Sequence, residues 1–445
     1  MSRPPNLLVL LSDQQRWDTL NCYGQPVETS PNLDRLAKAG VRFEHAFSCQ
    51  PVCGPVRACL QTGKYATEVG CHVNNRRLPA SETTLAHRLA AAGYETAYIG
   101  KWHLASCGPR GGPDDFQQRA VPPDRRGGYD YWLAADVLEH TSHGYDGHMF
   151  DAQGRQRDFP PGQFRVDVET DWVLEYLRSR TSDKPFFLFV SYLEPHQQND
   201  HGHVEGPTDS KERFADFMPP SDLIDTDGEW RQEYPDYLGC VHSLDRNVGR
   251  IFDELTRLGL ASETLLLYTS DHGCHFRTRT RTHKHSCHES SIRVPLIAHG
   301  PGFEGGKVVS QLVSLIDLPP TLLAAAGIET PAEMRGRPVQ QLLVGPREDW
   351  PGEVFVQVSG SQCGRALRTS RWKYSARAPD KSGGDPCSEV YVDDLLYDLQ
   401  ADPHERNNLV GQPGYEKIAR SLRDRLRKRI VQAGEREPVI RSAWA

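Results

Sequence analysis

The most restrictive feature of this sequence is a repeated pairing of an apolar segment with a polar cluster that follows it directly. Continuous apolar runs of this kind are typical of strands buried on both faces of a mainly parallel sheet. Ligand sites in open α/β sheets lie beyond the carboxyl ends of the strands, so we expect the polar clusters to converge. The pairs are residues 6–11 before Asp13, 94–99 before Lys101 and His103, 186–193 before His196, and 264–269 before Asp271 and His272.

Helical patterns lie between the apolar runs. Residues 31–39 read as a helix with Ser30 as N-cap, Pro31 in the first position and Gly40 as the stop. Residues 84–92 form a second helical segment, and an apolar stripe over residues 238–258 marks one face of a long helix. This alternation predicts an α/β fold with a large, mainly parallel (mixed) sheet sandwiched by helices.

The pattern changes at about residue 345. Short alternating runs at 353–358, 365–369, 372–375 and 390–398 predict antiparallel strands, and 415–431 predicts a helix. We therefore predict a large α/β domain at residues 1–345 and a small C-terminal α+β subdomain at 346–445. Residues 106–165 are rich in Gly, Pro and charge, which predicts long loops that border the site.

Charge and hydropathy exclude several classes of partner. The formal net charge of −7 gives no electrostatic basis for binding nucleic acid or an anionic membrane. No apolar run approaches the roughly 20 residues that span a bilayer. The apolar run after Asn6 is too short for a secretory signal, so the expected location is the cytoplasm. The oligomeric state is not predicted.

The eleven cysteines have irregular spacing, which argues against a disulfide framework. A zinc site built from Cys49, Cys53, Cys59, Cys71 and His72 is a weaker alternative, because only Cys49 and Cys53 approach the paired spacing of structural zinc ligands.

One cysteine stands in a distinctive motif. Cys53 is followed by Pro55 two residues later and by Arg57 four residues later. The nearby Thr62-Gly63-Lys64 is not a phosphate-binding loop, because Ala58 stands where the motif needs glycine.

The strand-end residues have the chemistry of a cation site with acids beside it. Asp13, Asp271 and His272 offer hard oxygens and an imidazole, which suit Ca²⁺ or Mg²⁺. Positioned acids for a poor leaving group come from Lys101, His103, His196 and Lys284. For each residue taken alone, a helix cap or turn, a buried histidine or a surface charge is the better explanation; two such strand ends with the cysteine motif between them favour a site.

Taken together, the motifs resemble the formylglycine-dependent (type I) sulfatases of the alkaline phosphatase superfamily, over nearly the whole chain. The segments that carry the resemblance are 6–15, the Cys53 motif, 92–104, Glu194-Pro195-His196, 268–273, 289–296 and 396–403.

The resemblance implies an alkaline phosphatase-like fold, with the sulfatase catalytic domain at 1–345, and a role for each site residue. Cys53 is converted to formylglycine by a formylglycine-generating enzyme, and its hydrate attacks sulfur. The implied catalytic residues are Cys53, Arg57, Lys101, His103, His196 and Lys284, with His196 and Lys284 as acids and His103 as base. The implied cation ligands are Asp13, Gln14, Cys53 as formylglycine, Asp271 and His272. The implied sulfate contacts are Lys101, His196, Lys284 and Asn74, with Asn75 as the alternative to Asn74.

One departure bears on the cofactor. Many sulfatases have a second aspartate where this chain has Gln14, so the site carries one negative charge less. The expected cofactor is one divalent cation, Ca²⁺ first, with Mg²⁺ or Mn²⁺ as alternatives.

The substrate is predicted only by class. The expected reaction is hydrolysis of a small-molecule sulfate ester. A sulfated carbohydrate is the preferred substrate class, and a simple aryl or alkyl sulfate is a nearly equal alternative. Arg277, Arg279 and Arg281 could line a pocket for an anionic sugar, or form a solvated loop. The alternatives are a phosphonate monoester or phosphodiester hydrolase, and a noncatalytic binding protein with a sulfatase fold.

Overall fold

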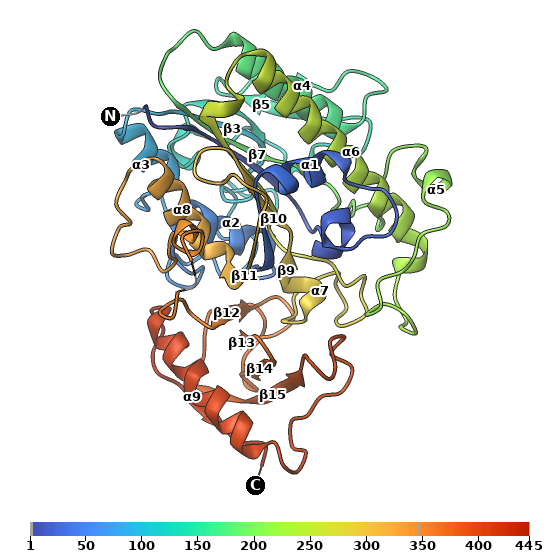
Figure 1. The fold of residues 1–445 in the computed structure, drawn as a ribbon, viewed down its shortest axis with the longest axis vertical. Coiled ribbons are helices and arrows are strands. Elements are labelled where there is room, and N and C mark those ends of the chain that lie inside the picture. Colours follow the sequence, from blue (N-terminus) through green and yellow to red (C-terminus); the bar gives the residue numbers. More distant parts are fainter. Residues whose placement is uncertain (1–2, 346, 445) are drawn as a thin grey trace.

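The computed structural model describes residues 3–345 and 347–444 and contains two sheets (Figure 1). The larger has eleven strands in the order β11-β2-β10-β8-β1-β7-β3-β4-β5-β6, with β9 paired to β2. Its strands are β1 Asn6–Ser12, β2 Val41–Phe47, β3 Glu95–Lys101, β4 Tyr131–Ala135, β5 His148–Asp151, β6 Gln156–Asp158, β7 Phe186–Ser191, β8 Thr264–Ser270, β9 Arg293–Val294, β10 Leu296–His299 and β11 Lys307–Ser314.

The central strands β8, β1, β7, β3 and β4 are mutually parallel, whereas β5, β6, β9 and β10 pair antiparallel with their neighbours. The prediction of a mainly parallel, mixed sheet is confirmed. Because the parallel strands are adjacent, the polar residues at their carboxyl ends share one edge.

Alternate residues of β1 enter two separate hydrophobic cores. Leu7, Val9 and Leu11 belong to one core, and Leu8 and Leu10 to the other. The first core includes side chains of α2 Cys53–Thr62, α3 Leu85–Ala91 and α8 Leu318–Ala325, and the second those of α1 Pro31–Ala39, α4 Arg165–Ser179 and α6 Trp230–Arg257. Helices therefore sandwich the sheet, as Figure 1 shows. The short helices α5 Ser210–Arg213 and α7 Glu289–Ile292 complete this part.

The second sheet has the order β12-β13-β14-β15-β16 and packs against α9 Glu416–Gln432. Its strands are β12 Glu353–Val358, β13 Gly364–Thr369, β14 Trp372–Arg377, β15 Val390–Asp398 and β16 Val439–Arg441. The core around Leu7 continues to Phe355 and Ile430, so it joins the two sheets. The domain division at 345 stays a prediction, and residue 346 lies outside the described residues.

Two local predictions need correction. Residues 106–165 are not only loops, because they contain β4, β5 and β6, which extend the sheet. Ser30 makes no capping hydrogen bond at the start of α1. Asp245 of α6 accepts the backbone N–H groups of Asn32 (3.1 Å) and Leu33 (2.7 Å) instead. No described helix combines the length and the apolar character needed to cross a membrane.

The capping role of Asp245 can be tested through the free energy of unfolding. Asp245→Ala leaves two N–H groups without an acceptor, so the free energy of unfolding should fall by about 2 kcal/mol. Urea unfolding measures the change. The control is Asp253→Ala on the same helix, where the carboxylate is exposed and lies 3.6 Å from Arg35; it should cost less than about 0.5 kcal/mol. Equal losses would contradict the capping role.

Candidate active site

Cys53 is the first residue of α2, a helix whose ten residues are all buried. Pro55 is tolerated in the first turn, where a backbone N–H has no intrahelical partner. The N–H of the preceding residue, Gly54, donates to the Asn74 side-chain oxygen at 3.0 Å. A Cβ at Gly54 would lie 3.0 Å from that oxygen and 3.3 Å from the carbonyl oxygen of His103. Because Cys53 is the first residue of α2, its side chain lies at the N-terminus of the helix, where the helix dipole favours negative charge.

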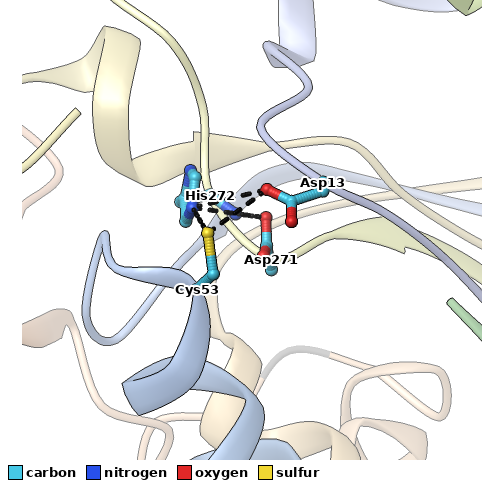
Figure 2. A group of neighbouring side chains, drawn as sticks. All are labelled: Asp13, Cys53, Asp271 and His272. Atoms are coloured by element: carbon cyan, nitrogen blue, oxygen red, sulfur yellow. Dashed lines mark hydrogen bonds and ion pairs between the residues drawn. The ribbon is translucent and has the colours of Figure 1, made fainter. Parts of the chain in front are cut away.

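The Cys53 thiol points into a group of cation-ligand type, shown in Figure 2. Ligand atoms of Asp13, Cys53, Asp271 and His272 all lie within 4.8 Å of one another. The sulfur lies 3.4 Å from an Asp13 oxygen and 3.1 Å from His272 Nε2. His272 Nδ1 lies 3.0 Å from the Gly273 carbonyl oxygen, which fixes the tautomer with a free lone pair on Nε2. These donors suit a divalent cation.

Gln14 completes this set. Its backbone has a positive φ of 68°, and its N–H donates to Asp271 at 2.9 Å. The side-chain Nε2 donates to Gln197, whereas the buried Oε1 has no hydrogen-bond partner among the described residues. A buried carbonyl oxygen without a donor is costly unless a cation binds it. The Gln14 side chain thus fits a divalent cation as a neutral oxygen ligand.

Arg57, one turn along α2, joins the two carboxylates. Its guanidinium donates to Asp13 at 3.1 Å and to Asp271 at 3.2 Å. It also donates to Ser191 at the end of β7 and to the Lys101 carbonyl oxygen. Arg57 is 2% exposed, so these contacts fix it in place between strands β1, β3, β7 and β8.

Lys101 lies fully buried between two carboxylates. Its ammonium is 2.8 Å from Asp13 and 3.0 Å from Glu139. Burial lowers the pKa of Lys101, but Asp13 and Glu139 outweigh this effect and raise the pKa above its usual range. The Lys101 side chain is therefore charged at any physiological pH.

Lys284 lies in the segment between β8 and α7, and its Nζ is 2.8 Å from the Cys53 sulfur. His196 is 5% exposed, and its Nδ1–H donates to the Gln197 carbonyl oxygen, 2.6 Å away. Burial, and next the charge of Lys284, lowers the pKa of His196 well below its usual range. Burial, and next Lys101, lowers the pKa of His103 to about 3. Both imidazoles are neutral at pH 7.

The two aspartates have opposite pKa shifts. Burial raises the pKa of Asp13, but the positive charges around it, Lys101 first and also Lys284 and Arg57, outweigh burial and hold the pKa well below its usual range. Burial and the neighbouring Asp13 charge raise the pKa of Asp271 to about 6. Like charges side by side resist joint ionisation, and a divalent cation between them removes that conflict.

The structure decides three points that the sequence left open: which asparagine lies beside Cys53, where the arginine run lies, and whether the cysteines form a zinc site. Asn75 turns away to accept a hydrogen bond from Gln117, so Asn74 is the asparagine beside Cys53. Arg277 does not join the group around Cys53, because its guanidinium donates to Glu229 at 2.7 Å. The other two arginines do not form a shared pocket with it: Arg279 donates to the carbonyl oxygens of His404 and Glu405, and Arg281 is exposed. The cysteine–zinc alternative is wrong, since no metal-binding group among the described residues includes Cys49, Cys59 or Cys71.

Sequence reasoning missed Glu139 and Ser191. Ser191 is the last residue of β7, and Glu139 follows β4, in the segment predicted as loops. The run Tyr131–Ala135 before Asp136 and Glu139 is another apolar strand with a polar cluster behind it, so the same pattern could have found Glu139.

Comparisons with known proteins find similarity by sequence and by fold. The "Sulfatase" family model matches residues 5–328, and "N-sulphoglucosamine sulphohydrolase, C-terminal" matches 281–376. An ulvan-active sulfatase of Formosa agariphila is 29% identical, over 97% of this chain and 82% of the relative. An N-acetylglucosamine-6-O-sulfatase of Bacteroides thetaiotaomicron is 24% identical, over 98% and 88%.

The fold also matches a protein solved in complex with its substrate D-glucosamine-2-N,6-O-disulfate, with a TM-score of 0.79, 23% identity and coverage of 98% and 99%. Because the sulfatase model spans most of the chain and relatives align along nearly all of it, the protein belongs to the type I sulfatases, sulfuric ester hydrolases of the alkaline phosphatase superfamily.

Proposed function

We propose that this sulfatase hydrolyses the sulfate monoester of a small carbohydrate through a formylglycine hydrate at residue 53. The observation that carries the proposal is the convergence of Cys53, Asp13, Asp271, His272 and Lys284 at one buried point. A noncatalytic binding protein would have no need of a nucleophile, cation ligands and an acid in mutual contact.

The nucleophile requires maturation. As a thiol, Cys53 is a poor nucleophile here, because burial and the Asp13 charge raise its pKa to about 12. Formylglycine instead offers a hydrated aldehyde, with two hydroxyl groups on one carbon. The proposed partner for maturation is a formylglycine-generating enzyme, which acts before the chain buries the Cys53 motif.

The proposed cofactor is one divalent cation, Ca²⁺ first, held by Asp13, Gln14, Asp271, His272 and residue 53. When bound, it stabilises negative charge on the hydrate and polarises the sulfate. Oxygen-rich ligands with a single imidazole favour Ca²⁺, and also admit Mg²⁺ or Mn²⁺.

The chemistry then follows from the surrounding residues. One hydroxyl of the hydrate releases its proton to solvent and its oxygen attacks sulfur, and the bond from sulfur to the sugar oxygen breaks. Lys284 carries a proton for that oxygen, and an anionic sulfate nearby would raise the pKa of His196 so that it can share this role. Lys101, Asn74 and Arg57 hold the charge on the sulfate and the nucleophile.

His103 completes the cycle. Burial and the charge of Lys101 lower the pKa of His103, so its imidazole is neutral, and the negative charge of a bound sulfate would raise its basicity for this role. It takes the proton of the second hydroxyl, the aldehyde reforms, and the bond to the sulfate breaks. This elimination releases inorganic sulfate and restores the formylglycine aldehyde, which takes up one water molecule to form the hydrate again.

A carbohydrate substrate is supported by the names of the relatives, which include enzymes of ulvan and of N-acetylglucosamine 6-sulfate. The test is a comparison of kcat/KM for N-acetylglucosamine 6-sulfate, an aryl sulfate and an aryl phosphonate, on protein co-expressed with a maturation enzyme. The proposal predicts the highest value for the sugar sulfate. A phosphonate preference would contradict it and favour the alternative hydrolase.

Cation removal gives a separate prediction. Chelation should abolish turnover, and Ca²⁺ should restore it. Asp271→Asn removes one ligand charge, so Ca²⁺ affinity measured by calorimetry should fall about 100-fold. Asp317→Asn is the matched control: Asp317 is also buried, and it accepts the N–H groups of Ser314 and Arg337. Unchanged affinity in Asp271→Asn would place the cation elsewhere.

A further inference from the structure

A second group of metal-ligand type lies beside the segment that carries Lys284. It consists of Glu229, Glu233 and His283. Glu229 is the N-cap of α6 and Glu233 lies in its first turn. Four residues apart, they share one face of the helix. His283 comes from the segment between β8 and α7 and immediately precedes Lys284.

The distances match those within a tetrahedral site. His283 Nε2 lies 3.3 Å from a Glu229 oxygen and 3.4 Å from a Glu233 oxygen. Two ligands of a tetrahedral zinc ion, each about 2.0–2.1 Å from the metal, are separated by about 3.3–3.4 Å. All three ligand atoms lie within 4.8 Å of one another.

The three ligand atoms lack other partners. His283 Nε2, Glu229 Oε2 and Glu233 Oε2 are buried, and none forms a hydrogen bond with any described residue. The His283 side chain is 2% exposed and that of Glu233 is 5% exposed. The ring nitrogen is near both carboxylates yet aligned for a hydrogen bond with neither, so a plain ion pair leaves all three atoms unsatisfied.

The surroundings supply an outer shell and an opening. Arg277 donates to the other oxygen of Glu229 at 2.7 Å. The Glu229 N–H donates to the Phe276 carbonyl oxygen at 3.1 Å, which already fixes this segment against α6. The Glu229 side chain is 34% exposed, so this side leaves room for ion entry and for a water as fourth ligand.

We propose that Glu229, Glu233 and His283 bind a divalent transition metal of the Zn²⁺ class, separate from the cation of the active site. The ion links the start of α6 to the segment that presents Lys284 to Cys53. Arg277 acts in this site as an outer-shell residue that orients Glu229. The inference does not depend on the proposed carbohydrate substrate.

The direct test is metal binding by the full chain in saturating Ca²⁺, which occupies the oxygen-rich site. Purified protein is titrated with Zn²⁺ against a chromophoric chelator and separately with Co²⁺. We expect one further equivalent of Zn²⁺ and the intense visible bands of four-coordinate Co²⁺. Absence of a further equivalent in the wild type would overturn the proposal.

Variants locate the site. Glu233→Gln and His283→Gln should each lose the Co²⁺ bands and weaken Zn²⁺ binding at least 100-fold, and Arg277→Gln should weaken it about 10-fold as an outer-shell change. His242→Gln, on the same helix and half-buried, is the matched control and should bind as the wild type does. Glu229→Gln, at the more exposed ligand, serves if the buried variants fail to fold. Zn²⁺ binding that survives both Glu229→Gln and Glu233→Gln would be adventitious and would refute the assignment.

Discussion

Replacing Cys53 with alanine should lower kcat/KM for a sulfate ester by roughly 10⁴- to 10⁶-fold, the range for loss of a covalent nucleophile. No neighbouring group can replace a hydrate on residue 53, because Asp13 is paired with Arg57 and Lys101, and no other side chain here carries two hydroxyl groups on one carbon. The variant should still fold, since alanine suits the first turn of α2. Steady-state kinetics and a thermal melt measure the two effects.

The matched control for Cys53→Ala is Cys59→Ala on the same helix. Cys59 is fully buried in the hydrophobic core and is not a member of the group of metal ligands around Cys53. The Cys59→Ala variant should lose some stability, because the removed sulfur leaves a small cavity, and it should retain the turnover of the wild type. Residual turnover in Cys53→Ala above about one hundredth of the wild type would exclude residue 53 as nucleophile.

The second large effect concerns Lys101. Lys101→Met leaves the buried carboxylate of Glu139 without its cation and takes one of two cations from Asp13. Breaking a buried ion pair by removing one partner costs about 3–5 kcal/mol, so the free energy of unfolding should fall by that amount. Denaturant unfolding measures it, and turnover should be lost because the sulfate loses a positive contact.

A double variant separates the stability role of Lys101 from its part in turnover. Lys101→Met with Glu139→Gln removes the unpaired charge and leaves Asp13 paired with Arg57, so at least half of the lost stability should return. Turnover should stay low. Recovery of turnover together with stability would show that Lys101 acts only by holding the fold.

The sequence predicted the central sheet because its strands are apolar on both faces, and the polar residues after β1, β3, β7 and β8 do share one edge. The sequence did not predict the roles of residues whose partners come from elements distant in the chain. Glu139 was missed because its strand lies in a segment dominated by turn residues. Arg277 was misplaced because its partner Glu229 lies far away in the chain. The Asp245 cap of α1 likewise arises from packing between helices distant in sequence.

The central claim is that residue 53 works as formylglycine, and mass spectrometry of the tryptic peptide 43–57 tests it most directly. This peptide holds Cys49 and Cys53, so Cys49 is an internal control within the same fragment. From active protein co-expressed with a formylglycine-generating enzyme, we predict a mass loss of about 18 Da that fragmentation assigns to residue 53 alone. An unmodified thiol at Cys53 in protein that hydrolyses sulfate esters would contradict the mechanism.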